Sequence, residues 1–200
     1  MSSDARGFLA GMTNNASMAT ASTVIPAGTW TVDPGHSRVG FAVRHLGISN
    51  VRGEFREFEG TLEIGDDLST ARAYGSVQVA SVDTNEPGRD DEIRSSNFLD
   101  AAQFPEITFE STKIEDLDGE ELRIAGRLTI HGITNEVVLH ADVGGTDLDL
   151  FGNERVGLEV TGVLARSDYG IKLTQALGSG NLVVGEKITL TLDLSAVKQA

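Results

Sequence analysis

The stretch ITLTLDL, residues 188–194, decides the fold class of this chain. Its apolar residues occupy every second position, with threonine or aspartate between them. Successive side chains of a β-strand point to opposite faces of its sheet, so this alternation predicts a strand with one buried and one solvated face. The same pattern is strong at 39–43, 122–130 and 156–160, and weaker at 51–64, 71–83, 107–117 and 136–143.

Turn residues separate these runs, and no long helical period appears. Asp118-Gly119 fits the type I′ turn of a β-hairpin. Hairpin-linked strands form an antiparallel sheet, which manages its edges by closing into a barrel or by packing as a sandwich. The length of the run 51–64 favours the barrel. We therefore predict an all-β fold, an elongated barrel of about eight antiparallel strands, with a short helical segment around 89–103.

The length of 200 residues indicates one domain with a tail. Residues 1–27 are rich in Ser, Thr, Ala and Asn and lack the basic start and apolar run of a secretory signal. We expect them to form a disordered or loosely ordered leader, followed by a single barrel domain over 28–200. The absence of a signal pattern predicts a cytoplasmic location.

Composition excludes several classes of function. The formal net charge is −14, which argues against nucleic-acid binding and against electrostatic docking on anionic membranes. There are no cysteines, so disulfides, thiolate metal sites and cysteine nucleophiles are excluded. No stretch approaches the roughly 20 apolar residues of a membrane span, so we expect no stable membrane insertion.

The polar residues do not suggest a catalytic or metal site. A hairpin turn placed at Ile133-Thr134 would separate His131 from His140 along the strand ladder, so we expect no metal. The carboxylates of residues 90–92 lack the spacing of a calcium loop and suit the start of a short helix. We expect no cofactor and no catalytic residue; an enzyme that uses His45 and an acid is the alternative.

Apolar residues are the stronger candidates for function. Phe41, Val43 and His45 share one strand face, with His45 near the strand end. The segment 97–105 is irregular, and we expect its phenylalanines to fold inward and wall part of an apolar tunnel. A barrel of this size either fills its interior with side chains or holds one small ligand. The predicted ligand-binding residues are Phe41, Val43, His45, Phe55, Phe98, Phe104, Phe109, Ile124 and Leu128.

Four segments together resemble the YceI-like family. TWTVDPGHSRVGFAVRHLGISNVRGEFREFEGTLEI (29–64) resembles its N-terminal pattern, and SVDTNEPGRDDEIRSSNFLDAAQFPEITFES (81–111) resembles its central signature. GRLTIHGITNEVVL (126–139) and ARSDYGI (165–171) are similar to two further elements. The resemblance implies a lipocalin-like barrel that binds polyisoprenoid or other long-chain amphiphiles in a tunnel. It also implies a periplasmic location for many members.

Three hypotheses follow. The first is non-enzymatic binding, storage or transport of an isoprenoid lipid or quinone. The second is an enzyme acting on a hydrophobic substrate, which needs a titratable pair converging on the cavity. The third is a structural or partner-binding barrel with a filled interior and an exposed apolar patch. A homodimer is compatible with the first and the third.

Overall fold

The structure is a computed structural model that describes residues 25–65, 68–172 and 182–200. Its strands belong to one antiparallel sheet, in the order β1-β4-β5-β7-β8-β9-β10-β11-β2-β3-β6. The elements are β1 (Gly28–Val32), β2 (Arg38–His45), β3 (Ser49–Phe55), β4 (Phe58–Ile64), β5 (Arg72–Gln78), β6 (Val82–Asp83), α1 (Pro87–Arg94), β7 (Glu106–Asp116), β8 (Glu121–Ile130), β9 (Ile133–Leu148), β10 (Glu154–Ala165) and β11 (Val184–Lys198), with short 3₁₀ turns η1 (Pro34–His36), η2 (Leu68–Thr70), η3 (Val79–Ser81) and η4 (Arg166–Tyr169).

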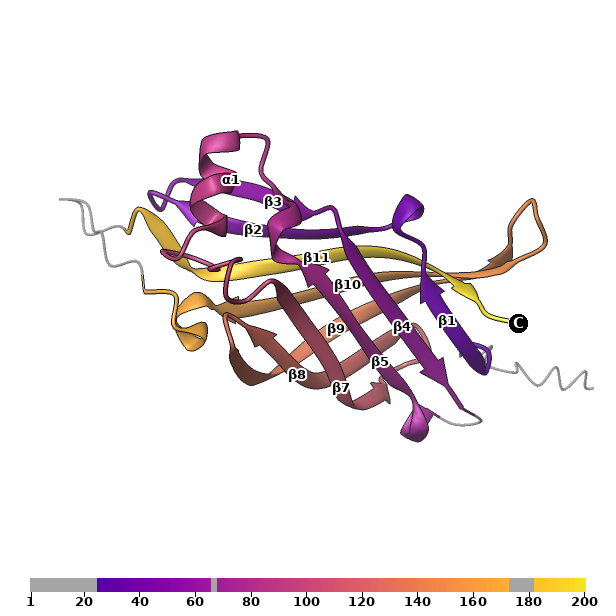
Figure 1. Ribbon diagram of the computed structural model, residues 1–200. Helices are drawn as coiled ribbons and strands as arrows, with labels where there is room; N and C mark the ends of the chain where they lie inside the picture. Colours follow the sequence, from indigo (N-terminus) through magenta and orange to yellow (C-terminus); the bar gives the residue numbers. More distant parts are fainter. Residues whose placement is uncertain (1–24, 66–67, 173–181) are drawn as a thin grey trace, which may run out of the picture.

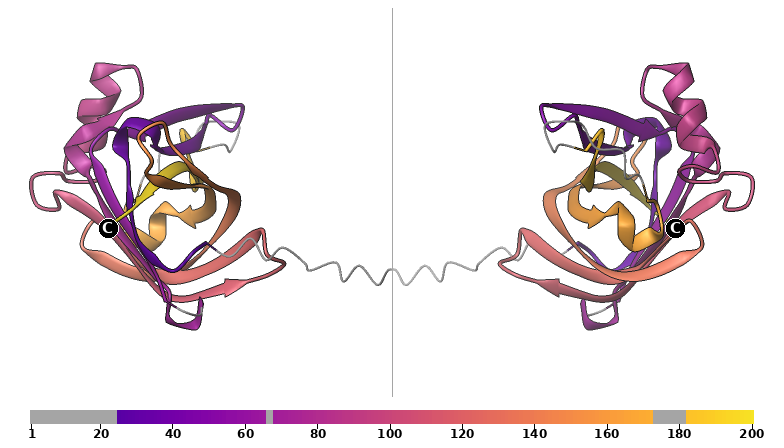
Figure 2. Two further views of the ribbon diagram at one scale, coloured as in Figure 1. Left: turned by 90° about the vertical axis from the view of Figure 1, so that its right-hand side faces the viewer. Right: turned by 90° about the vertical axis from the view of Figure 1, so that its left-hand side faces the viewer.

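The sheet closes because β1 pairs with β4 on one side and with β11 on the other. Three of the long strands are interrupted: η1 divides β1 from β2, residues 56–57 divide β3 from β4, and η3 divides β5 from β6. Counted with these breaks, eight long strands follow one another around the barrel, and Figure 2 shows the ring end-on. The predicted elongated eight-stranded barrel is confirmed.

Trp30 anchors the closure of the barrel. The residue is fully buried on β1, and its indole N–H donates to the carbonyl of Pro26 at 3.1 Å. The Nζ atom of Lys198, on β11, lies 5.5 Å from the centre of its ring. Ile25 is also buried and packs in the same core. Ile25, within the predicted leader, therefore packs with the barrel; residues 1–24 lie outside the described residues.

The predicted helical segment is present, although its regular part is shorter than expected. Helix α1 begins after Glu86, whose carboxylate accepts from the backbone N–H of Gly88, and it ends at Arg94. Residues 95–104 continue as successive hydrogen-bonded turns. The helix lies outside the barrel beside β6 (Figure 1). Among the described residues, no helix has the length and apolar character of a membrane span.

The carboxylate of Asp90 has a structural role in the first turn of α1. It is buried and accepts from the backbone N–H of Thr84 at 2.8 Å and from the Thr84 hydroxyl at 2.6 Å. The guanidinium of Arg89 donates to the same hydroxyl and to the Thr84 carbonyl. Asp90 thus fixes the approach of the chain to the helix, as its predicted place at a helix start implies.

The predicted turn at Ile133-Thr134 is wrong by two residues. Ile130 pairs with Ile133, so His131 and Gly132 form the loop, with φ of 52° and 73°. A two-residue hairpin loop of this kind needs positive φ at both positions, which Gly132 adopts without cost. Arg127 therefore pairs with Glu136, and His140 pairs with Arg123.

Candidate ligand-binding cavity

The barrel encloses an apolar cavity of about 230 Å³. Its wall consists mainly of residues that alternate along the strands toward the interior, as the sequence pattern requires. The apolar side chains of the wall are Val32, Val39, Phe55, Phe58, Leu62, Ala73, Val77, Ile107, Phe109, Ile114, Leu122, Ile124, Leu128, Ile130, Leu139, Leu158, Val160, Leu164, Leu190, Leu192, Leu194 and Ala196.

Two opposed glycines thin the wall between β4 and β5. Gly60 lies opposite Gly75, so neither residue contributes a side chain, and the Val32 side chain packs over Gly60 instead. The neighbouring residues Glu59, Thr61, Tyr74 and Ser76 also reach the lining. The hydroxyls of two of these neighbours already have carboxylate partners. The Tyr74 hydroxyl donates to Glu63 at 3.0 Å, and the Ser76 hydroxyl donates to Glu59 at 3.4 Å. The cavity is therefore suited to an apolar ligand body rather than to a charged group.

Four of the predicted binding residues lie in the cavity wall: Phe55, Phe109, Ile124 and Leu128. Phe109 is held by its cross-strand surroundings, because its ring covers Gly126 on β8. A Cβ atom at position 126 would lie 2.5 Å from the Phe109 Cζ atom. The absent side chain of Gly126 thus makes room for the ring. A role of these four residues in binding stays a prediction.

Phe41, Val43 and His45 are not part of the wall. They share a strand face with Val39, which does line the cavity, but they lie farther along β2. The Phe41 ring packs over Gly53 and contacts the Phe55 ring at 5.7 Å between centres. His45 stands at the end of β2, paired with Ser49 across the β2–β3 turn. Sequence alternation gave the correct face but could not give the position along it.

Phe98 and Phe104 fold against the barrel, also outside the cavity wall. Phe98 packs on a second buried cluster made by Leu128, Ile130, Tyr169 and Ile171. Phe104 covers Gly132 and meets the His131 ring edge-on, with 4.8 Å between ring centres. Both rings are partly buried rather than exposed. Their predicted inward packing is therefore present, but Phe104 packs on the β8–β9 turn and Phe98 on the second cluster, and neither ring lines the cavity.

The turn η4 lies within the barrel outline at one end (Figure 2). Arg166 is buried there and donates to the carbonyl oxygens of Ile171 and Gly185, at 2.7 and 3.1 Å. Tyr169 is also buried, and burial raises the pKa of its phenol. Within the described part of the chain its hydroxyl has no hydrogen-bond partner. Through Arg166, this turn is bonded to Ile171 and to β11, which fixes residues 166–171 after β10.

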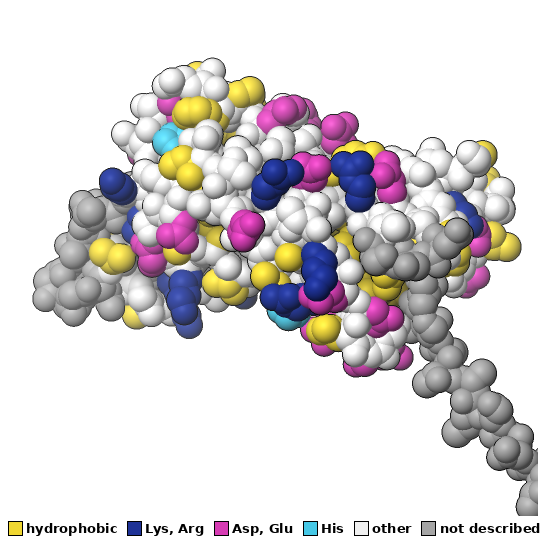
Figure 3. Space-filling view, turned by 90° about the horizontal axis from the view of Figure 1, so that it is seen from below, with side chains coloured by type: hydrophobic (Ala, Val, Ile, Leu, Met, Phe, Trp, Pro, Cys, Tyr) yellow, Lys and Arg dark blue, Asp and Glu magenta, His cyan; other side chains and the backbone are white. Residues whose placement is uncertain are grey.

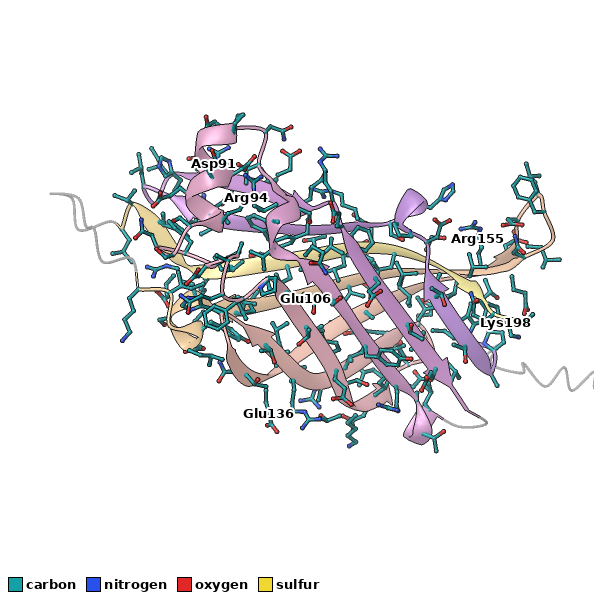
Figure 4. All side chains as sticks on the ribbon, in the orientation of Figure 1. Asp91, Arg94, Glu106, Glu136, Arg155 and Lys198 are labelled. Carbon is teal, nitrogen blue, oxygen red and sulfur yellow. The ribbon has the colours of Figure 1, made fainter. Side chains whose placement is uncertain are left out.

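Charged groups at the opposite end form a compact network around Arg155, which Figure 4 labels beside Lys198. The guanidinium donates to Asp33 at 2.8 Å and to Asp149 at 2.9 Å. The hydrogen bond from Arg155, together with one from His36, holds the pKa of Asp33 at about 2. Bonds from Asn153, together with Arg155, lower the pKa of Asp149 as well. The network ties the β9–β10 loop to the chain after β1.

The outer surface carries charges of both signs in close pairs (Figure 3). Glu110 on β7 accepts a hydrogen bond from Arg72 on β5 at 3.1 Å and another from Arg127 on β8 at 3.0 Å. Two histidines also face carboxylates at the surface, His36 with Asp33 and His140 with Glu121. In residues 25–65, 68–172 and 182–200, no three potential metal ligands converge.

Most of the wall residues were not singled out from the sequence. Leu62, Ile114, Leu139, Leu158 and Leu190 line the cavity. Four of them obey the period-two alternation, whereas Ile114 follows a bulge between Ser111 and Lys113 that shifts the inward face of β7 by one residue. Leu139, Leu158 and Leu190 lie within long strands and away from their ends, and this placement is the signal that could have found them. The predicted binding residues were instead mainly aromatic, and several of them lie at a strand end or in the irregular segment.

A closed antiparallel barrel with a flanking helix and an apolar interior defines a lipocalin-like protein. Residues 30–196 match the model of the YceI-like domain, and the chain belongs to this family. It is 35% identical over 165 residues to protein YceI of Escherichia coli O157:H7, covering 82% of this chain and 83% of that protein.

Two solved structures resemble the barrel. A Campylobacter jejuni YCEI protein superposes with a TM-score of 0.68 at 27% identity, over 78% of this chain and 90% of that one. A polyisoprenoid binding domain from Saccharophagus degradans, implicated in plant cell wall breakdown, superposes with a TM-score of 0.65 at 13% identity, over 85% of this chain and 98% of that domain. The second likeness concerns the fold.

Proposed function

We propose that this protein binds an isoprenoid or another long-chain amphiphilic lipid in the barrel cavity, without catalysing a reaction. The observation that carries this proposal is the apolar wall, in which the hydroxyls of two of the few polar residues, Tyr74 and Ser76, are already hydrogen-bonded to Glu63 and Glu59. Burial of a CH₂ group stabilises a complex by about 0.8 kcal/mol, so each five-carbon isoprene unit would contribute on the order of 3–4 kcal/mol before ordering costs.

Membership of the YceI-like family supports a lipid ligand, as does the structural likeness to a polyisoprenoid binding domain. The cavity volume limits the length of the bound chain. At about 230 Å³ it is smaller than the roughly 300–1,000 Å³ of common ligand sites. We therefore propose that a short prenyl chain fits into the cavity at its present volume. For a long chain, either only the first isoprene units enter the cavity or the barrel widens.

Binding underlies the roles of storage and transport that we propose for the protein. A cytoplasmic location is likewise a proposal, based on the composition of residues 1–27. Fractionation of the native host tests the location. Transfer of labelled prenyl lipid between vesicles tests transport, since a pure storage protein would retain its ligand.

Adjacent residues on β10 offer a matched test of the cavity. Leu164 lines the cavity, whereas Val163 is exposed on the outer face. In native mass spectrometry with farnesol or solanesol, we expect Leu164→Trp to reduce uptake at least about tenfold, because an overpacked wall leaves less room. Val163→Trp should bind as the unmodified protein does. Equal uptake by both variants, or no uptake by any form, would contradict ligand binding in the cavity.

A further inference from the structure

The β9–β10 hairpin ends in an exposed apolar tip, defined here as Leu148, Leu150 and Phe151. Their relative exposures are 63%, 101% and 89%. β9 pairs with β8 only as far as Asp142. Beyond that point, in the described part of the chain, residues 145–148 of β9 pair with β10 alone. Figure 1 shows this hairpin projecting past β1 at one end of the barrel. Isolated exposed apolar residues are ordinary, but three at one projecting tip mark an interaction surface.

Most backbone N–H groups of the tip are hydrogen-bonded within the tip itself. The Asp149 carboxylate accepts from the N–H groups of Phe151 and Asn153, both at 2.9 Å. The N–H of Gly152 donates to the Asp149 carbonyl, and the N–H of Leu148 donates to the Asp147 carboxylate. An unpaired N–H is costly in a medium without water. The loop can therefore leave water without exposing these four donors.

Asp149 also fixes the tip to the barrel. Its second carboxylate oxygen accepts from Arg155 at 2.9 Å and from the Asn153 side chain at 3.0 Å. Arg155 is in turn paired with Asp33, on the far side of β11. The three apolar side chains are thus presented on a braced loop, which loses little conformational freedom when the tip is buried.

The size and charge of the tip decide between occupants. One large aromatic side chain buries about 150–250 Å², so three apolar side chains fall short of the roughly 800 Å² per partner of a stable protein interface. Interfacial anchoring by insertion needs no such area. Asp147 and Asp149 flank the apolar residues, and the whole chain carries a net charge of −14. Anionic lipid would repel this end.

We propose that the β9–β10 tip inserts Leu148, Leu150 and Phe151 into the interface of a neutral, zwitterionic lipid bilayer. The tip docks the barrel on the surface, while Asp149 and Arg155 hold the loop in shape. The inference goes beyond ligand binding in the cavity and does not depend on it.

A tryptophan probe tests the insertion directly. Trp30 is fully buried, so it gives a constant background in the full-length protein. Phe151→Trp should shift its emission to the blue with phosphatidylcholine vesicles and should be quenched by brominated acyl chains. Ile48→Trp is the matched control, since Ile48 is also an exposed apolar residue at a hairpin turn. An unchanged Phe151→Trp spectrum, or an equal shift of the control, would overturn the proposal.

Binding measurements complete the test. In vesicle sedimentation, we expect the pair Leu150→Ser and Phe151→Ser to weaken partitioning at least about tenfold, and added phosphatidylglycerol to weaken that of the unmodified protein. Stronger binding to the anionic vesicles overturns the choice of surface. A dimer that these substitutions dissociate, without vesicle binding, identifies a second copy as the occupant and also overturns the proposal. The vesicles contain no isoprenoid, so failure here is separate from failure of cavity binding.

Discussion

At the scale of single residues, Asp33 shows how a surface carboxylate can stabilise a barrel end. One oxygen accepts from Arg155 on β10 and from the His36 ring, both at 2.8 Å, and the other accepts from the N–H of Gly35 at 3.0 Å. All three contacts favour the ionised form. Asp33 therefore connects the chain between β1 and β2 to β10 only while it is charged.

The pH dependence of stability follows from the sign of this shift. The pKa of Asp33 falls from 3.8 to about 2 on folding, so its contribution is present above pH 3.8 and is lost as the pH falls through that window toward 2. We expect Asp33→Asn to lower the urea midpoint at neutral pH and to flatten its decline in acid. Asp193→Asn removes an exposed carboxylate on β11 and should leave the acid profile unchanged; equal profiles for both variants would contradict the role of Asp33.

Residue choice was also where prediction from sequence was weakest. Alternation placed Phe41 correctly on the face of β2 that carries Val39, yet of the two predicted residues Phe41 and Phe55 only Phe55 lines the cavity. The difference depends on the Gly53 beneath Phe41 and on how far β2 runs past the cavity. Neither depends on the residue's own neighbours in the sequence, so a local pattern could not separate the two.

At the scale of elements, β7 and β8 fit together through a ring over a glycine. A Cβ atom at position 126 would lie 2.5 Å from the Phe109 ring and 2.7 Å from the carbonyl oxygen of Glu110. The ring could turn away, but the backbone oxygen could not. Gly126 is therefore required for the close approach of the two strands at the cavity wall.

Gly126→Ala should destabilise the protein by about 1–3 kcal/mol, as overpacking commonly does. Because Phe109 lines the cavity, the same change should also displace its ring and reduce prenyl uptake. Gly157→Ala on β10 is the control, since nothing lies within 4 Å of its added Cβ atom. Urea unfolding and native mass spectrometry measure the two effects; an equal stability for both alanine variants would show that the predicted clash is relieved.

Strands were easier to predict than the turns between them. The β7–β8 hairpin is where Asp118-Gly119 indicated it, but its loop spans residues 117–120 and only Gly119 has positive φ, at 91°. Asp118 instead accepts from the N–H groups of Glu120 and Glu121. Both this turn and the one at His131-Gly132 depend on cross-strand register, which period-two alternation does not specify to the residue.

At the scale of the whole molecule, the order of the strands around the barrel follows their order along the chain. Each long strand pairs with the next, and the interruptions at η1, residues 56–57 and η3 bend strands without changing that order. Alternation with short links therefore predicted an antiparallel sheet, and the length of the run 51–64 favoured its closure into a barrel. The cavity could not be predicted in this way, because its presence depends on the combined sizes of many inward side chains.

The pairing of β1 with β11 has a further consequence, because it brings the two ends of the described barrel together. The N–H of Gln199 donates to the carbonyl of Thr29 at 2.7 Å. A circular permutant is therefore feasible: a short Gly-Ser linker joins residue 200 to residue 25, and new termini open in the exposed β7–β8 loop. We expect it to keep the far-UV circular dichroism and prenyl uptake of the parent, whereas opening β8 between Ile124 and Ala125 should prevent folding. The barrel would then behave as a ring whose starting point is a matter of choice.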